Sequence, residues 1–156
     1  MATTTKGDWE AVEIGSVEAP QGFAEAVLRD LLGAFPHIRL RVSGACLDPE
    51  VTSGDRVHVA RPALRPPGFG DIVLRRHPRG LRLHRVVWAP AAGLGAWRTR
   101  GDHSTVWDPA LSPEDVLGTV VWIEGKGRPR PGIAGWKSLL VGLLARARAE
   151  FRPTAA

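Results

Sequence analysis

The feature that most constrains this chain is a series of six short, strand-like runs. Apolar and polar residues alternate along "HIRLRV" and along the four central residues of "DRVHVA". The runs cover residues 37–42, 55–60, 71–76, 81–88, 95–101 and 116–124. Segments rich in proline and glycine separate them, and one of these, "HPRG", is typical of a hairpin turn. Since no long helical pattern lies between the runs, the sequence predicts a mainly β protein with an antiparallel sheet or a partly open barrel.

Helical patterns flank this strand-rich region on both sides. Apolar residues recur at helical spacing over residues 20–34, and a second apolar face runs over residues 134–150, after the basic, proline-rich linker "GKGRPRPG". We therefore divide the chain into a flexible segment (1–19), a folded domain (20–124) and a linker with a C-terminal helix (125–156). The C-terminal helix is expected to dock on the sheet, on a partner or on a membrane surface.

Composition narrows the classes of function. The chain has 21 basic and 16 acidic residues, a net charge of +5, which permits binding to nucleic acid, anionic lipid or an acidic peptide. The basic residues are scattered rather than grouped, so we do not expect nucleic-acid binding as the main role. The first twenty residues lack the apolar core of a secretory signal, and the longest apolar stretch is too short to span a bilayer. We therefore expect a cytoplasmic protein.

The chain holds a single cysteine, Cys46, in the stretch "VSGACLDPEV". One cysteine excludes an internal disulfide and a four-cysteine zinc site, and we expect neither a metal nor a cofactor. A lone cysteine is commonly a small buried hydrophobe. Cys46, however, lies between Gly44 and Pro49, where a predicted strand gives way to a turn. Backbone N–H groups at such places can converge on an oxyanion, so Cys46 is a candidate nucleophile.

A nucleophile needs a base, and the base needs an orienting group. The five histidines of the chain are the candidates for the base: His37, His58, His77, His84 and His103. His84 has the best setting, because the apolar run "LRLHRVV" would partly desolvate a neutral imidazole. Asp102 and Asp108 are candidates for the orienting acid. Both aspartates also have sequence settings typical of turns, and spacing alone does not separate these interpretations.

Six motifs, in their order along the chain, resemble the peptidase domain shared by LexA-type self-cleaving repressors and type I signal peptidases. These motifs are "VSGACLDP", "GDRVHV", "GDIVL", "LHRVV", "RGDHSTVWD" and "VLGTVVW", and the resemblance covers residues 38–124. The resemblance implies a coiled, partly closed antiparallel sheet with short N-terminal and C-terminal helices. Cys46 stands where that family has its nucleophilic serine, with Leu47 at the position of the methionine and Pro49 at that of the proline.

The resemblance also assigns the other two roles. His84 stands where the endoplasmic-reticulum and archaeal-type signal peptidases have a histidine base, and Asp108 is similar to the acid that completes their triad. Asp102 is the alternative for this third role. The chain departs from the family by having cysteine in place of serine and by lacking the usual membrane spans. Cysteine with a histidine base is nevertheless coherent chemistry, since a thiol ionises far more readily than a hydroxyl.

These observations predict a signal-peptidase-like hydrolase, a cysteine-type endopeptidase that cuts one bond in an extended segment of a protein or precursor peptide. The substrate would bind as an added strand, with a small residue at the cleaved position as the family implies. The segment "EIGSVEAP" is a candidate for self-cleavage. The alternative is a non-catalytic relative that binds an extended peptide as an adaptor. Only about 37 residues precede the first predicted strand, too few for a helix-turn-helix module, so we do not expect a DNA-binding repressor.

Overall fold

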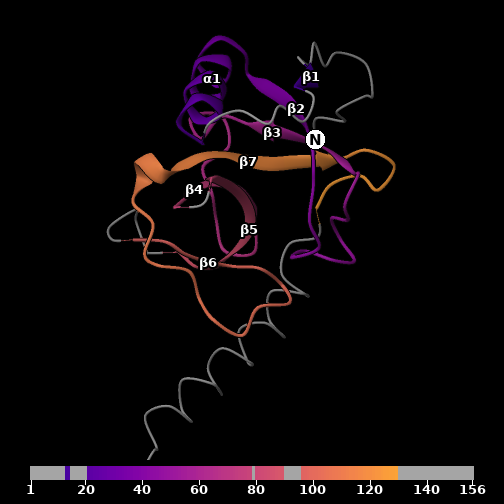
Figure 1. Ribbon diagram of the computed structural model, residues 1–156, viewed down its shortest axis with the longest axis vertical. Coiled ribbons are helices and arrows are strands. Elements are labelled where there is room, and N and C mark those ends of the chain that lie inside the picture. The colour runs from indigo at the N-terminus through magenta and orange to yellow at the C-terminus, as the bar shows by residue number, and fades with distance from the viewer. Residues whose placement is uncertain (1–12, 15–20, 79, 90–95, 130–156) are drawn as a thin grey trace, which may run out of the picture.

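The structure is a computed structural model that describes residues 13–14, 21–78, 80–89 and 96–129. These residues form a mainly β fold in which one α-helix precedes most of the strands (Figure 1). Seven strands join in a single open sheet in the order β1-β2-β3-β7-β4-β5-β6. Strands β2 to β7 pair antiparallel, and β1 joins the edge in parallel. The predicted mainly β class and antiparallel sheet are therefore confirmed, and the sheet is not closed.

Each of the six predicted runs overlaps one strand. The strands are β2 (His37–Arg41), β3 (Arg56–Ala60), β4 (Ile72–His77), β5 (Gly80–Trp88), β6 (Arg98–Arg100) and β7 (Val116–Ile123). The helix α1 spans Gln21–Ala34, as the helical spacing predicts, and a short 3₁₀ helix, η2 (Pro113–Asp115), precedes β7. The second predicted helix, over residues 134–150, lies outside the described residues.

One strand lies where we predicted a flexible segment. β1 (Glu13–Ile14) pairs in parallel with Arg39 and Leu40 on the outer edge of β2, a pairing that the sequence did not predict. Two residues are too few to show alternation. Such a strand forms because the edge of a sheet offers unpaired backbone groups, and a sequence pattern carries no record of that edge.

The order of the strands brings the two ends of the domain together. β4 and β5 form a hairpin closed by the pair His77 and Gly80, as predicted for "HPRG". β7 then runs between β3 and β4 and joins the β2–β3 pair to the β4–β5–β6 group (Figure 1). Gly118 makes this crossing possible, because a β-carbon there would lie 2.5 Å from Val59 Cγ1 and 2.6 Å from the Ala60 carbonyl oxygen.

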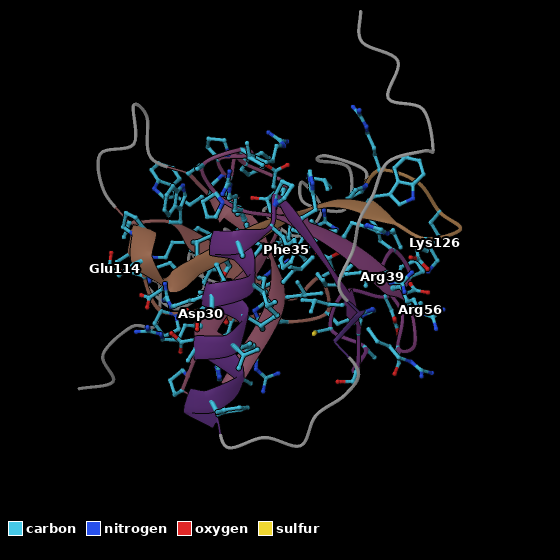
Figure 2. All side chains as sticks on the ribbon, turned by 90° about the horizontal axis from the view of Figure 1, so that it is seen from above. Asp30, Phe35, Arg39, Arg56, Glu114 and Lys126 are labelled. Atoms are coloured by element: carbon cyan, nitrogen blue, oxygen red, sulfur yellow. The ribbon has the colours of Figure 1, made fainter. Side chains whose placement is uncertain are left out.

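The helix α1 covers one face of the sheet. Seen from above, α1 lies across the strands, with Phe35 just after its C-terminal end (Figure 2). Leu28 and Leu32 pack into the larger of two apolar clusters, and burial of each such side chain stabilises the fold by about 1.5–3 kcal/mol. Glu25 fixes the helix to β4 through an ion pair with Arg76 of 2.5 Å. The second cluster lies apart from the helix and is formed by Val73, Val86, Leu111 and Val116.

In the part of the chain that the structure describes, no helix is both long enough and apolar enough to cross a membrane.

Candidate active site

Cys46 lies in the turn that follows β2. The pairing of β2 extends one step into this turn, since Val42 N donates to Asp55 O and Gly54 N donates to Val42 O, both at 2.8 Å. Gly44 then reverses the chain with a φ of 100°, a left-handed conformation that glycine adopts without steric strain. Cys46 follows as a half-buried thiol. The setting is the end of a strand, as the sequence predicts.

His84 lies near the middle of β5 and bonds to Asp108. Its side chain is buried, and its Nδ1 atom lies 2.5 Å from Asp108 Oδ2. The amide of Asp108 donates to Thr99 O on β6, and Thr99 Oγ1 donates to the same carboxylate oxygen at 2.6 Å. Since the carboxylate accepts a hydrogen bond from Nδ1–H, the neutral imidazole carries its lone pair on Nε2.

The Nε2 side of His84 meets Cys46 across Gly101. A β-carbon built on Gly101 would lie 3.0 Å from Cys46 Cβ and 3.4 Å from His84 Nε2, so both side chains border the same small space. His103 N also donates to Cys46 O at 3.4 Å and links the two loops. The structure therefore brings Cys46, His84 and Asp108 together. Among the described residues no hydrogen bond reaches the Cys46 sulfur, and catalytic contacts often tighten only when substrate binds.

Asp102, the alternative orienting acid, does not contact His84. Its two oxygens accept from Arg85 Nε at 2.9 Å and from Arg85 Nη2 at 2.7 Å. The same guanidinium also donates to Glu50 Oε2 at 2.7 Å and to Gly70 O at 2.9 Å. His84 and Arg85 are consecutive residues of one strand and point to opposite faces of the sheet. The candidate for the orienting acid is therefore Asp108, while Asp102 holds a buried arginine.

A second buried arginine shapes the electrostatics of the site. Arg75 on β4 is 3% exposed; its Nη1 lies 3.0 Å from Asp108 Oδ2 and donates to Thr99 Oγ1 at 2.9 Å. Burial by itself raises the pKa of Asp108. Hydrogen bonds from His84 and Thr99, together with the charges of His84 and Arg75, outweigh burial and lower the pKa of Asp108 below its ordinary value. Sequence reasoning missed Arg75 and Thr99, since neither stands out in its motif.

The other histidines lie in different surroundings. His58 is buried and its Nε2 lies 3.1 Å from Glu124 Oε1. The Nε2 atom of His103 lies 3.0 Å from Asp48 O. His37 and His77 each stand at the end of a strand. Of the five candidates for the base, His84 is the one whose imidazole both borders Cys46 and bonds to the carboxylate of an aspartate.

A cavity of about 290 Å³ opens beside Cys46, between α1, the end of β2 and the start of β5. Its lining is mostly apolar and includes Phe23, Val27, Leu40, Val42, Leu47, Leu74, Leu81 and Leu83. Within the described chain, β6 pairs only with the second half of β5, Arg85 to Trp88, so the first half has no strand on that side. An extended peptide entering the cavity would meet this free backbone edge.

The described ranges contain no group of three or more histidine, cysteine, aspartate or glutamate side chains placed to hold a metal ion. The chain matches no protein-family model, no curated protein and no solved structure. The geometry of Cys46, His84 and Asp108 is therefore the main structural guide to the function of this protein.

Proposed function

We propose that this protein is a cysteine-type endopeptidase that cuts an extended segment of a protein or precursor peptide. The observation that carries the proposal is the placement of His84. One nitrogen of its imidazole bonds to the half-buried Asp108, and the other lies beside Cys46 across Gly101. Nucleophile, base and orienting acid in this sequence of contacts form the arrangement shared by unrelated hydrolases.

In the proposed reaction, His84 Nε2 takes the thiol proton of Cys46, and the sulfur attacks the carbonyl carbon of the scissile bond. The imidazolium then gives its proton to the leaving amine as the C–N bond breaks, which leaves a thioester on Cys46. His84 next removes a proton from water, whose oxygen attacks the thioester, and the carboxylic product and the thiol are released. Asp108 stabilises the imidazolium in both steps.

Two further features support the proposal. In the described part of the chain, the amides of Ala45 and Cys46 donate to no backbone carbonyl, which leaves them available for the oxyanion of the tetrahedral intermediate. The motifs that resemble the LexA and signal-peptidase domain also contain the three residues to which we assign catalytic roles.

A second candidate is an adaptor that binds an extended peptide without cutting it. The observation that favours it is the apolar cavity beside a free strand edge, which can hold a peptide whether or not Cys46 reacts. The lack of a hydrogen bond to the Cys46 sulfur, among the described residues, is also compatible with an inert thiol. The two candidates differ in the reactivity of one sulfur.

Alkylation of Cys46 by iodoacetamide separates the two, because Cys46 is the single cysteine and the label reports one site. If His84 activates the thiol, His84→Ala slows alkylation at pH 7 by about tenfold or more, since the thiolate is the reactive form. His103→Ala is the matched control, because its ring bonds to Asp48 O and to no carboxylate among the described residues. Equal rates in the wild type and in His84→Ala would favour the adaptor.

Cleavage itself is tested with a library of synthetic peptides, with products identified by mass spectrometry. We expect the wild-type protein to cut a subset of the library and Cys46→Ala and His84→Ala to cut none. Cys46→Ser should retain weak activity, because a histidine base can also activate a hydroxyl. Cleavage that survives in Cys46→Ala would rule out the proposed nucleophile.

A further inference from the structure

We propose that the cavity beside Cys46 selects a substrate peptide that carries a bulky apolar residue next to an acidic one. The inference rests on the proposed function and adds a substrate class to it. It also differs from the small residue that the family resemblance implies for the cleaved position.

The size and lining of the cavity favour a bulky apolar side chain. Its volume of about 290 Å³ is far more than an alanine methyl group fills and is close to the lower limit of typical ligand pockets. Leu28 and Val27 of α1 line one side, and Leu81 and Leu83 of β5 line another. The Glu25–Arg76 ion pair joins α1 to β4. A leucine or phenylalanine side chain would remove this apolar surface from water, whereas alanine would leave most of it uncovered.

The charges at the cavity favour an acidic neighbour. Arg41 and Arg82 both line it, and neither forms an ion pair with any acid in the described ranges. Arg82 Nε is buried and has no hydrogen-bond partner there. Arg29 and Arg76, by contrast, both pair with Glu25. A carboxylate on the peptide would supply the missing partner for one or both guanidinium groups.

The test measures binding of fluorescein-labelled, alanine-based octapeptides to full-length Cys46→Ala protein, in which cleavage cannot occur. A Glu-Leu pair is moved one position at a time along the peptide, and each peptide is compared with matched Glu-Ala and Lys-Leu versions. We expect the best Glu-Leu peptide to bind at least about tenfold more tightly than either version, as burial of several methylene groups and a charge-assisted hydrogen bond imply. Equal binding of the three peptides overturns the proposal.

Two substitutions on one helix assign the preference to the cavity. Ala24 lines the cavity and Ala26 is exposed on the same helix. We expect Ala24→Trp to abolish the preference for leucine over alanine and Ala26→Trp to leave it unchanged, with thermal melts confirming that both variants fold. If Ala24→Trp does not fold, Val27→Phe tests the same space.

Arg82→Gln should remove the preference for glutamate over lysine while that for leucine remains. A leucine preference that survives a filled cavity overturns the proposal.

The inference and the proposed function fail in different ways. Binding of Glu-Leu peptides to Cys46→Ala, without their cleavage by the wild type, would retain the subsite and remove the peptidase. Cleavage by the wild type with no preference for Glu-Leu would retain the peptidase and remove the subsite. A third outcome would also overturn the inference. If the Cys46→Ala protein shows no peptide preference and Ala24→Trp changes its oligomeric state, a second copy of the chain fills the cavity.

Discussion

Gly101 faces Cys46 so closely that a β-carbon on residue 101 would lie 3.0 Å from Cys46 Cβ and 3.1 Å from the Cys46 carbonyl oxygen. The same atom would lie 3.4 Å from His84 Nε2. Side chains larger than hydrogen at this position must therefore move the turn that carries the thiol, the imidazole, or both. Cys46 and His84 can therefore lie this close together only because residue 101 has no side chain.

Gly101→Ala is predicted to reduce the reactivity of Cys46 without unfolding the protein. A displacement of the thiol by a fraction of an ångström to about 1 Å can reduce the rate by up to about a hundredfold. Iodoacetamide labelling at neutral pH measures the effect. Gly33→Ala, in a helix with nothing within 4 Å of the added carbon, is the control and should label at the wild-type rate. Unchanged labelling in Gly101→Ala would show that the thiol does not depend on this contact.

Asp108→Asn is predicted to reduce both activity and stability. The structure gives this carboxylate two roles, since it orients His84 and also neutralises the buried Arg75. Activity should fall by orders of magnitude, as for orienting acids in other triads, and the free energy of unfolding should fall by about 3 kcal/mol. Replacing Arg75 with methionine in the same protein should restore stability but not activity. Recovery of both properties would contradict the role of Asp108 toward the imidazole.

The stability contributed by Asp108 should depend on pH. Because the pKa of Asp108 is lowered in the folded state, its contribution is present above the ordinary aspartate pKa of about 3.9 and is lost as pH falls through the folded value. Urea unfolding at pH 6 and at about pH 3 measures the loss. Wild type should lose more stability than Asp108→Asn, since the other carboxylates are common to both proteins. Equal losses would show that Asp108 does not ionise with a lowered pKa.

Arg85 and Arg100 lie directly opposite each other on β5 and β6, and both are fully buried, yet their substitution should have different effects. Arg85 pairs with Asp102 and Glu50, so Arg85→Met leaves two carboxylates without their partner and should cost about 3–5 kcal/mol. Arg100 has two nitrogens with no hydrogen-bond partner in the described chain, and burial lowers its pKa. Arg100→Met should be neutral or stabilising. Thermal and urea unfolding measure the stability of the two variants. Equal losses of stability in Arg85→Met and Arg100→Met would contradict the expectation that only Arg85 is stabilised by ion pairs.

The strands and the first helix were predictable because each has a sequence period that burial imposes. The runs "HIRLRV" and "DRVHVA" alternate, and β2 and β3 form there. β1 was not predictable, because its two residues are held by the edge of β2 rather than by a pattern of their own. The spacing of the runs along the sequence could not predict the order of the strands either. β7 comes last in the domain and yet lies between β3 and β4.

Part of the site was predictable for the same kind of reason. Cys46 and His84 stood out by residue type and setting, while Asp102 and Asp108 were not separable by spacing. Register separates them, because Asp102 follows Arg100, the cross-strand partner of Arg85, and Asp108 bonds by its amide to Thr99 O. Arg75 comes from a different strand, so its role at Asp108 depends on the pairing of distant segments.

On β5, the consecutive residues His84 and Arg85 point to opposite faces of the sheet. This arrangement limits where the protein can accept an insertion or a deletion. His84 bonds to Asp108, while Arg85 holds Glu50, from the loop of Cys46, and Asp102, from the loop of Gly101. Insertion of one residue within the strand would turn each following side chain to the opposite face of the sheet. The imidazole of His84 would then lie beside the carboxylates that now bind the guanidinium of Arg85. Changes in chain length should therefore be tolerated at the turn before β5 and after its end, and excluded between Leu83 and Val86.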